Sequence, residues 1–308
     1  MTVKNYIKHN ILRVEADMLN AIVHFYGSLC GMVYECETVS SSHYPYCHDG
    51  KLHIFTYKLT DEHTHKPTGL CFVVDKGKFS VSYRNQGYWK VGIVLQDVNR
   101  AVKFLSREGI RVGPGSQFVD VGFLTSLQDP QGHGIELLQD TFQKNFREIK
   151  ENTAPLNQPY LPTLGQITIR CADAEKTCRF YSEVLGMKLL CTEVPGNTYP
   201  FTLYFFAYTD ETPPHADDLS AVENREWTYQ RPYCQIEIQH RHNTGTDFTY
   251  VTGDEQGQGV LGHAGFALHV QRELLREIAR KCEGAQNVGE NLVYVEDPDG
   301  YLIQLSCD

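Results

Sequence analysis

Residues 167–187 read ITIRCADAEKTCRFYSEVLGM, and residues 11–32 read ILRVEADMLNAIVHFYGSLCGM. Each copy begins with a short β-like segment that ends in arginine, continues through a helix, and closes on Phe-Tyr and Gly-Met. A second element also occurs twice, as DPQGHGIELLQ at 129–139 and DPDGYLIQLSC at 297–307. Repetition at a spacing of about half the chain indicates a duplicated structural unit. The sequence therefore predicts two tandem halves.

Each half divides again into two smaller units. In the second half, FTLYFFAY at 201–208 and CQIEIQH at 234–240 are rich in the aromatic and β-branched residues typical of strands. GHAGFALHV at 262–270 starts a further unit and precedes a helix-like segment. Asp-Pro-Asp-Gly at 297–300 favours a tight turn between two final strands. Because the first half repeats this order, we predict an α+β fold of four βαβββ units in two tandem domains.

The domain boundaries follow from the composition between the halves. We predict an N-terminal domain over 1–142, a linker over 143–162 and a C-terminal domain over 163–308. The linker is polar and then punctuated by Pro155, Pro159 and Pro162.

Composition limits the class of protein. The chain has 308 residues, of which 41% are hydrophobic and 21% charged, so a disordered or fibrous protein is excluded. No run approaches the ~20 apolar residues of a membrane-spanning helix. The net charge of −10 and the absence of a basic cluster argue against nucleic-acid binding. The ten cysteines form no CxxC pair and no secretory signal is visible, so we expect reduced thiols and a cytoplasmic location.

Six segments of the second half identify a family when they are read in order. They are LGQITIRCAD, FYSEVLGMKLL, FTLYFFAYTDE, QIEIQHRHN, GVLGHAGFAL and DPDGYLIQL, and they lie within 164–308. The first half carries weaker counterparts, HNILRVEAD, FYGSLCGM and DPQGHGIELL. The series resembles the vicinal oxygen chelate superfamily and, within it, the glyoxalase I (lactoylglutathione lyase) enzymes. The resemblance implies paired units that curl around a divalent metal, with zinc or nickel as the favoured ions.

The resemblance also implies which residues hold the metal. In the second half the ligand positions are occupied by Gln166, Glu237, His263 and Gln304. The corresponding positions of the first half hold His9, Val81, Lys90 and Glu136, of which His9 and Glu136 are weaker candidate ligands. Valine cannot bind a metal, and a lysine ammonium has no free lone pair. The first half therefore has a degenerate ligand set, and we expect the metal site in the C-terminal domain.

Two ways of pairing the four units remain open. Pairing within each half keeps the four ligand positions of the second half together. Crossed pairing would give one site from His9, Val81, His263 and Gln304, and another from Gln166, Glu237, Lys90 and Glu136. We expect pairing within each half, because it gathers the surviving ligands into one cavity.

The implied reaction is isomerisation of the hemithioacetal that a 2-oxoaldehyde such as methylglyoxal forms with a thiol, through an enediolate. Gln304 stands where the family usually carries the glutamate that moves the proton, and glutamine cannot accept one. We therefore predict Glu237 as the base, and Arg170 and Asn243 as contacts to a small-molecule substrate that is glutathione-derived. The basic anchors for the far end of glutathione are not visible, and Glu290 stands near one of them.

Three alternatives to this function remain open. In the first, the cavity binds a small molecule without catalysis. In the second, the protein is a related enzyme that uses another thiol or none. A related ring-cleaving dioxygenase is the third, although its iron site requires two histidines and a carboxylate.

Overall fold

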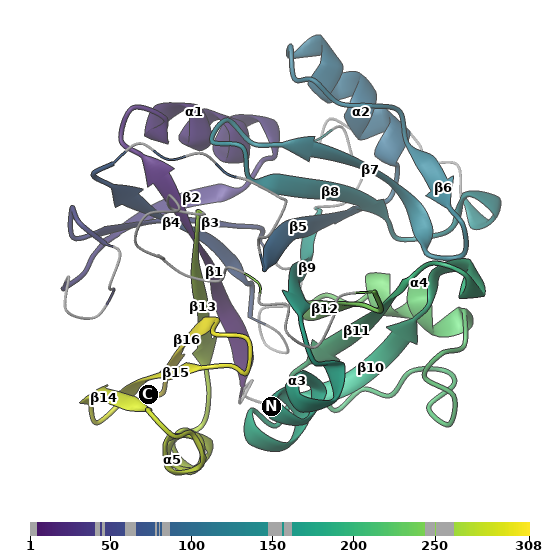
Figure 1. Ribbon diagram of the computed structural model, residues 1–308. Helices are drawn as coiled ribbons and strands as arrows, with labels where there is room; N and C mark the ends of the chain where they lie inside the picture. Colours follow the sequence, from purple (N-terminus) through teal and green to yellow (C-terminus); the bar gives the residue numbers. More distant parts are fainter. Residues whose placement is uncertain are drawn as a thin grey trace.

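The computed structural model describes residues 5–40, 44, 47–58, 66–77, 79, 81, 87–146, 156, 162–243, 250 and 262–308. Over these residues the chain forms two mixed sheets of eight strands each, with helices packed on their outer sides (Figure 1). The predicted α+β class and the four βαβββ units are confirmed.

The four units follow one another along the chain with the same order of elements. The first consists of β1 (Tyr6–Glu15), α1 (Leu19–Val23) continued by a π-helical turn (His24–Leu29), β2 (Val33–Thr38), β3 (Lys51–Thr56) and β4 (Gly69–Asp75). The second consists of β5 (Tyr88–Leu95), α2 (Val98–Arg107), β6 (Ser116–Phe118), β7 (Gly122–Gln128) and β8 (Gly134–Gln139).

The third and fourth units come from the second half. The third consists of β9 (Thr163–Cys171), α3 (Ala174–Arg179) continued by a π-helical turn (Phe180–Val184), β10 (Lys188–Glu193), β11 (Phe201–Ala207), α4 (Glu223–Tyr229) and β12 (Gln235–Arg241). The fourth consists of β13 (His263–His269), α5 (Arg272–Lys281), β14 (Gln286–Gly289), β15 (Leu292–Glu296) and β16 (Leu302–Ser306). Short 3-10 turns lie at Gln143–Asn145 and Pro195–Asn197 within the described part of the chain.

The units pair across the two halves of the chain. The first sheet has the order β14-β15-β16-β13-β1-β4-β3-β2, and the second has the order β10-β11-β12-β9-β5-β8-β7-β6. Figure 1 shows this directly, because the purple and yellow ends of the chain share one sheet and the teal and green middle forms the other. The expectation of pairing within each half is wrong. Crossed pairing places the Lys90 ammonium among carboxylates from both halves, and a buried charge is tolerated when such partners surround it.

The predicted domains and linker are therefore names for stretches of the sequence, because neither half forms a sheet by itself. Residues 1–142 and 163–308 are two halves that each contribute strands to both sheets. Within 143–162, residues 147–155 and 157–161 lie outside the described part of the chain.

The two repeated motifs contact each other in each half and thereby tie the sheets together. Asp129 Oδ1 accepts hydrogen bonds from the backbone N–H groups of Gln131, Gly132 and His133, which closes the DPQG turn. Its second oxygen accepts a hydrogen bond from Tyr26 of the first Phe-Tyr pair at 3.1 Å. In the second half, Tyr181 donates to Asp297 in the same way at 3.1 Å. Because the two units of a half lie in different sheets, these hydrogen bonds join the sheets.

A buried ion pair joins β1 and β4 in the first sheet. Arg13 lies on β1, and its Nε is 2.7 Å from Oδ2 of Asp75 at the end of β4. Both side chains are buried. The same position of the third unit is Arg170, which binds Gln239 instead.

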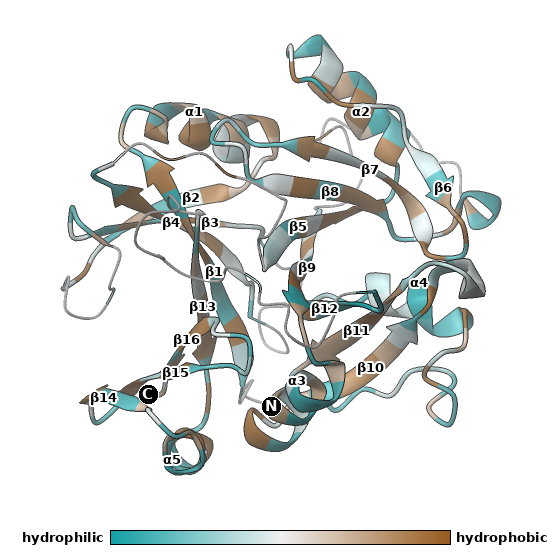
Figure 2. Cartoon of the chain, in the orientation of Figure 1, coloured by the Kyte–Doolittle hydropathy of each residue, from teal (hydrophilic) through white to brown (hydrophobic). Residues whose placement is uncertain are grey.

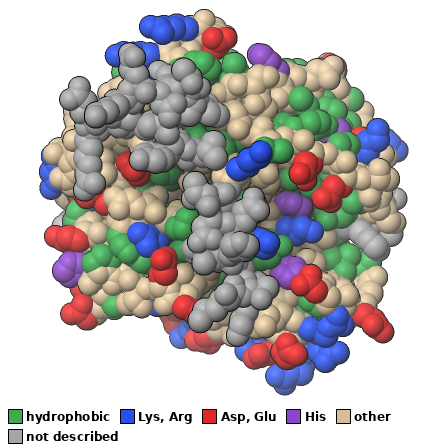
Figure 3. Space-filling view, turned by 180° about the vertical axis from the view of Figure 1, so that it is seen from behind, with side chains coloured by type: hydrophobic (Ala, Val, Ile, Leu, Met, Phe, Trp, Pro, Cys, Tyr) green, Lys and Arg blue, Asp and Glu red, His purple; other side chains and the backbone are tan. Residues whose placement is uncertain are grey.

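The apolar core runs between the sheets and their helices. Figure 2 shows strands that are largely brown, whereas α2 and α5 alternate between brown and teal, as expected for helices with one buried face. The large core cluster includes apolar residues of all four units, among them Leu12, Val91, Ile167 and Phe266. On the face shown in Figure 3, acidic and basic side chains are interspersed. Among the described residues, no helix has both the length and the apolar character needed to cross a membrane.

Candidate functional site

A cavity of about 210 Å³ lies on the face of the second sheet that is turned away from the core. Its walls are mainly apolar and aromatic, and its charged and amide side chains come from four adjacent strands, β8, β5, β9 and β12. The lining residues are Trp89, Lys90, Phe118, Val121, Leu124, Ser126, Glu136, Leu138, Gln166, Phe201, Leu203, Phe205, Tyr229 and Glu237. Apolar walls around a few convergent polar groups are typical of small-molecule sites.

Strand register brings the polar groups together in two rows across the sheet. Glu136, Gly92 and Gln166 are successive partners on β8, β5 and β9, while Thr168 lies between Lys90 and Glu237. Partners in neighbouring strands project to the same face. Gly92 has no side chain, and a Cβ there would lie 2.3 Å from Cγ of Gln166. The glycine therefore leaves room for the Gln166 side chain to cross β5 toward Glu136.

The polar groups form one buried cluster of contacts. Lys90 Nζ lies 2.5 Å from Oε2 of Glu136. Gln166 Nε2 donates to Glu237 Oε2 at 2.8 Å and to Glu136 Oε1 at 3.2 Å. Thr168 Oγ1 donates to the same oxygen of Glu237 at 2.5 Å. Each carboxylate is therefore held by at least two groups, which fixes the positions of both at the base of the cavity.

Burial and neighbouring charges set the ionisation of the cluster. Burial raises the pKa of Glu237, the Lys90 ammonium opposes that rise, and Glu136 adds to it. Burial alone would lower the pKa of Lys90, but the negative charges of Glu136 and Glu237 outweigh burial and raise it. Lys90 is therefore an ammonium, and Glu237 is a weaker acid than an exposed glutamate.

The candidate ligands predicted from the sequence divide between the two sheets. Gln166, Glu237 and the weaker candidate Glu136 meet at this cavity. His263, Gln304 and the weaker candidate His9 lie in the first sheet, and none of them lines the cavity among the described residues. The expectation that Gln166, Glu237, His263 and Gln304 converge on one cation is therefore wrong.

His263 also faces away from His9 and Gln304 within its own sheet. The pairing of β13 with β1 passes from Gly265↔Ile11 to His263↔Leu12, so Ala264 is an extra residue in β13. Such a bulge reverses which face the preceding side chain occupies. His263 Nε2 lies 3.1 Å from Asn10 Oδ1, and the ring stacks on Tyr88 at 4.4 Å. Burial lowers the pKa of His263 to about 3.

The first sheet offers little space at the corresponding place. His9, Ala267 and Gln304 are successive partners across β1, β13 and β16. The adjoining cavity measures about 10 Å³, roughly the space for one water molecule, and apolar residues such as Ile11 and Val73 line it. Burial lowers the pKa of His9 to about 3. The cavity of the second sheet is therefore the candidate functional site.

The two predicted substrate contacts differ in their placement. Arg170 is buried on the same strand face as Gln166, donates to Gln239 at 3.0 Å, and lies 4.8 Å from the ring centre of Trp89 in the cavity wall. Burial lowers its pKa to about 10. Asn243 lies exposed in the turn after β12, and neither Asn243 nor Arg170 is among the described residues that line the cavity.

The residues of this cavity do not fit a divalent metal as they are arranged. Two carboxylates and an amide oxygen are acceptable ligands, but the fourth group is an ammonium with three donors and no acceptor. Gln166 also turns its amide nitrogen toward both carboxylates. Within the described part of the chain, no group of three His, Cys, Asp or Glu side chains is placed to hold a metal ion.

Sequence reasoning missed three side chains of the site. Lys90 departs from the expected ligand pattern, but a basic residue among acidic ones is also a counter-ion. Thr168 lies two residues after Gln166, so the strand period of two was the signal for its position on the same face. Trp89 gave no signal, because its place in the wall depends on a register irregularity between Tyr88 and Lys90.

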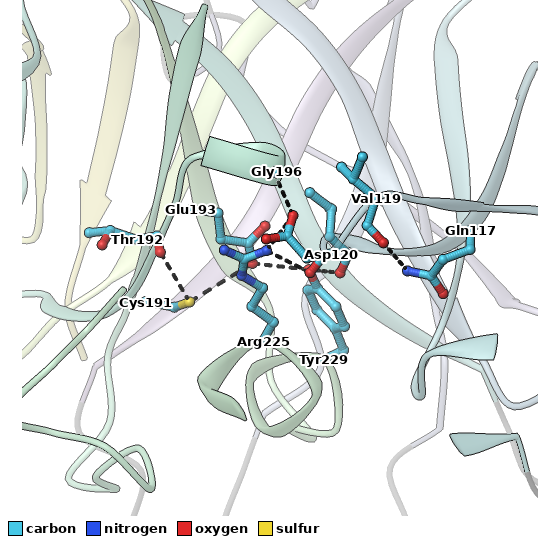
Figure 4. A network of polar contacts seen from close by, with 10 residues as sticks. Gln117, Val119, Asp120, Cys191, Thr192, Glu193, Gly196, Arg225 and Tyr229 are labelled. Carbon is cyan, nitrogen blue, oxygen red and sulfur yellow. Dashed lines mark hydrogen bonds and ion pairs between the residues drawn. The ribbon is translucent and has the colours of Figure 1, made fainter. Parts of the chain in front are cut away.

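A second buried carboxyl lies behind the cavity wall. Glu193 on β10 is fully buried, and its Oε1 is 3.0 Å from the hydroxyl of Tyr229, which lines the cavity. Figure 4 shows Arg225 beside it, paired with Asp120 at 2.9 Å. Burial raises the pKa of Glu193 to about 8, with Arg225 acting against the rise and Glu237 adding to it. Glu193 is therefore protonated at neutral pH.

Replacing Glu193 with glutamine is expected to change the pH dependence of stability. The pKa of Glu193 lies above its ordinary value of 4.5, so the unfolded chain releases this proton first and the free energy of unfolding falls as pH rises toward 8. Glu193→Gln removes this contribution, which amounts to up to about 1.4 kcal/mol per pH unit. Urea unfolding of both proteins between pH 5 and about 8.5 measures the difference. Parallel pH profiles would contradict the assignment.

Comparison with known proteins relates the chain to a family. Residues 163–305 match the model of the glyoxalase/bleomycin resistance protein/dioxygenase superfamily. A glyoxalase I of Saccharomyces cerevisiae is 26% identical over 237 residues, which cover 72% of this chain and 64% of that relative. A lactoylglutathione lyase of Arabidopsis thaliana is 25% identical over 218 residues, which cover 70% and 65%. The match thus spans slightly less than two thirds of each relative.

Solved structures share the fold over nearly the whole chain. The crystal structure of glyoxalase I from Zea mays superposes with a TM-score of 0.65 at 17% identity, covering 98% of this chain and 92% of that one. A putative dioxygenase from Bacillus subtilis superposes with a TM-score of 0.60 at 15% identity, covering 100% and 86%. At these identities the likeness concerns the arrangement of strands and helices.

Proposed function

From the premise that residues 163–305 match the glyoxalase/bleomycin resistance protein/dioxygenase superfamily, we propose that the protein is a glyoxalase I-like isomerase. Its substrate would be the hemithioacetal of a 2-oxoaldehyde such as methylglyoxal and a thiol. The observation that carries the proposal is the pair of buried carboxylates, Glu136 and Glu237, that face one cavity and are linked through Gln166. The reaction moves a proton between adjacent carbons, and a positioned carboxylate is suited to that task.

The chain's own residues supply the groups that the reaction needs. Glu237 would take the proton from the carbon that bears the sulfur, and the electron pair of that C–H bond would move toward the neighbouring carbonyl oxygen. The Lys90 ammonium would stabilise the charge that develops on the oxygens of the enediolate. Glu237 would then return the proton to the neighbouring carbon, and the hydroxyl proton of the sulfur-bearing carbon would pass to the oxygen of that neighbour, giving the thioester of a 2-hydroxy acid with no atom gained or lost.

The local pKa values suit these two roles. A base is most effective when its pKa lies near the working pH, and burial moves the pKa of Glu237 in that direction. The raised pKa of Lys90 keeps the ammonium charged during the reaction. Glu136 holds this ammonium in place through their 2.5 Å contact, so we assign it a positioning role.

The thiol part of the substrate is proposed to be glutathione. The names of the relatives, glyoxalase I and lactoylglutathione lyase, support this choice. Arg170 is the proposed partner for a glutathione carboxylate, because its guanidinium lies against Trp89 at the cavity wall. Asn243 is assigned a weaker contact from the exposed turn.

The proposal is tested by an ultraviolet assay of thioester formation with the wild-type protein. Methylglyoxal is mixed with glutathione in one series and with 2-mercaptoethanol, which has no carboxylate, in another. We expect a rate that is proportional to protein concentration and higher with glutathione. A rate no greater than the uncatalysed one with both thiols would reject the isomerase.

One observation favours a second candidate, a binding protein without turnover. The ion pair of Lys90 with Glu136 already neutralises one carboxylate of the cavity. Calorimetric binding of S-methylglutathione together with no turnover in the assay would support this function. A ring-cleaving dioxygenase is not proposed, because its iron site needs two histidines and the described residues lining this cavity include none.

A further inference from the structure

Lys90 is paired with one member of a set of groups that would otherwise suit a cation. Its Nζ contacts Glu136 at 2.5 Å, and the Gln166 amide bridges Glu136 and Glu237 beside it. All four side chains are buried, and they come from four neighbouring strands rather than from one mobile loop. The sheet therefore presents two carboxylates and an amide to one point, where the side chain of Lys90 already supplies a positive charge.

The chain itself shows what stands at the same position in the other sheet. In the first sheet His9, Ala267 and Gln304 form the row that Gln166, Gly92 and Glu136 form in the second. Lys90 lies two residues before Gly92, and Gly265 lies two residues before Ala267, so Gly265 stands at the position of Lys90. The two repeats thus differ at this position between a residue without a side chain and one that carries a positive charge. The carboxylates Glu136 and Glu237 lie in the repeat pair that carries the lysine.

We propose that Lys90 is the built-in cation of this site and that it excludes divalent metal ions from it. The ammonium offsets the buried carboxylates in the folded protein without any bound ion, which stabilises a pair that would otherwise leave negative charge uncompensated. An ion placed between the same carboxylates would have to displace Lys90 and would be repelled by its charge. The inference goes beyond the proposed reaction, because it concerns what the site holds and not what it converts.

The inference is tested by making the lysine a ligand. Lys90→His would join an imidazole to Glu136, Glu237 and Gln166, which is a donor set acceptable to Zn²⁺ and Co²⁺. The matched control is Lys103→His, since Lys103 is exposed on α2 and its replacement adds a histidine away from the cavity. Co²⁺ is titrated into wild type and both variants and followed by its visible absorption, and bound Zn²⁺ is counted by elemental analysis after dialysis.

We expect about one Zn²⁺ per chain in Lys90→His, and wild type and Lys103→His to retain none beyond adventitious binding to surface histidines. The affinity for Co²⁺ should rise by about 100-fold over wild type, because groups that merely support ligands already change metal affinity by about 10–100-fold. Adding Glu136→Gln to Lys90→His should abolish the gain. Folding of each variant is checked by circular dichroism.

Two results would overturn the inference. One is a wild-type protein that retains one metal ion per chain and loses it in Glu136→Gln. The other is a folded Lys90→His that binds no more metal than Lys103→His. If Lys90→His does not fold, the metal content of the wild-type protein tests the inference alone. A wild-type protein that retains no metal would then support the exclusion of metal by Lys90. The readout is metal content, so it stands apart from the turnover that tests the proposed function.

Discussion

Glu237→Gln is expected to lower kcat for the isomerisation by about 10³-fold, which is the usual contribution of a positioned acid–base group. The substitution keeps the shape of the side chain, and its amide oxygen can still accept the hydrogen bonds from Thr168 and Gln166. It removes only the ability to take a proton. Because burial raises the pKa of Glu237, exchanging it for a neutral group is expected to leave the fold intact. Steady-state kinetics and thermal unfolding measure the two effects separately.

Glu136→Gln is the comparison that identifies the base. It lines the same cavity and contacts Gln166 as Glu237 does, but it is the direct partner of Lys90. We expect a smaller loss in kcat from this variant, because the ammonium would lose its position while the base remained. A full loss of activity in Glu136→Gln with activity retained in Glu237→Gln would reassign the proton transfer to Glu136.

Arg13→Met is expected to lower the free energy of unfolding by about 3–5 kcal/mol, the cost of leaving one charge of a buried ion pair without its partner. Asp75 would remain buried at the end of β4 after losing the guanidinium that lies 2.7 Å away. Methionine fills a similar volume, so the effect comes from the charge rather than from a cavity. Urea unfolding of both proteins measures the difference.

The chain offers an exposed pair as a matched control. Arg179 and Glu175 form an ion pair on α3 with 65% and 74% of their side chains exposed. Arg179→Met should change stability by less than about 1 kcal/mol, because solvent screens such pairs. Equal losses of unfolding free energy in Arg13→Met and Arg179→Met would contradict the prediction, because they would show that the buried ion pair stabilises the fold no more than the exposed one.

The four units were predictable from the sequence because their signals are local. The Asp of each DPxG turn binds the backbone of its own turn, and Asp97 and Asp173 cap α2 and α3 through the N–H groups of Arg100 and Lys176. Each of these contacts spans a few residues, so the motif and its structure occur together.

The pairing of the units was not predictable from the same signals. All four units begin with a similar strand, and nothing within β1 specifies whether β5 or β13 lies beside it. The choice depends on contacts between distant residues, such as Gln166 with Glu136. As a metal ligand Lys90 argues against crossed pairing, whereas as a counter-ion to Glu136 and Glu237 it favours that pairing.

Half of the candidate site could still be predicted. The family resemblance points to Gln166 and Glu237, and the alternation of polar and apolar residues in QIEIQ is that of a strand with Glu237 on its polar face. The prediction that His263 joins the site was wrong, because one extra residue at Ala264 turns its side chain toward Asn10 and Tyr88. A single-residue bulge leaves no periodic trace in a strand of seven residues.

The exchange of partners between the halves has a consequence for how the protein diverged. Two separate copies of one half, assembled around a twofold axis, would have to contain two identical cavities, because any substitution would appear in both. Joining the halves in one polypeptide removes that constraint. One cavity carries two acids and a lysine, whereas its counterpart in the other sheet is small and lined mainly by aliphatic and aromatic side chains.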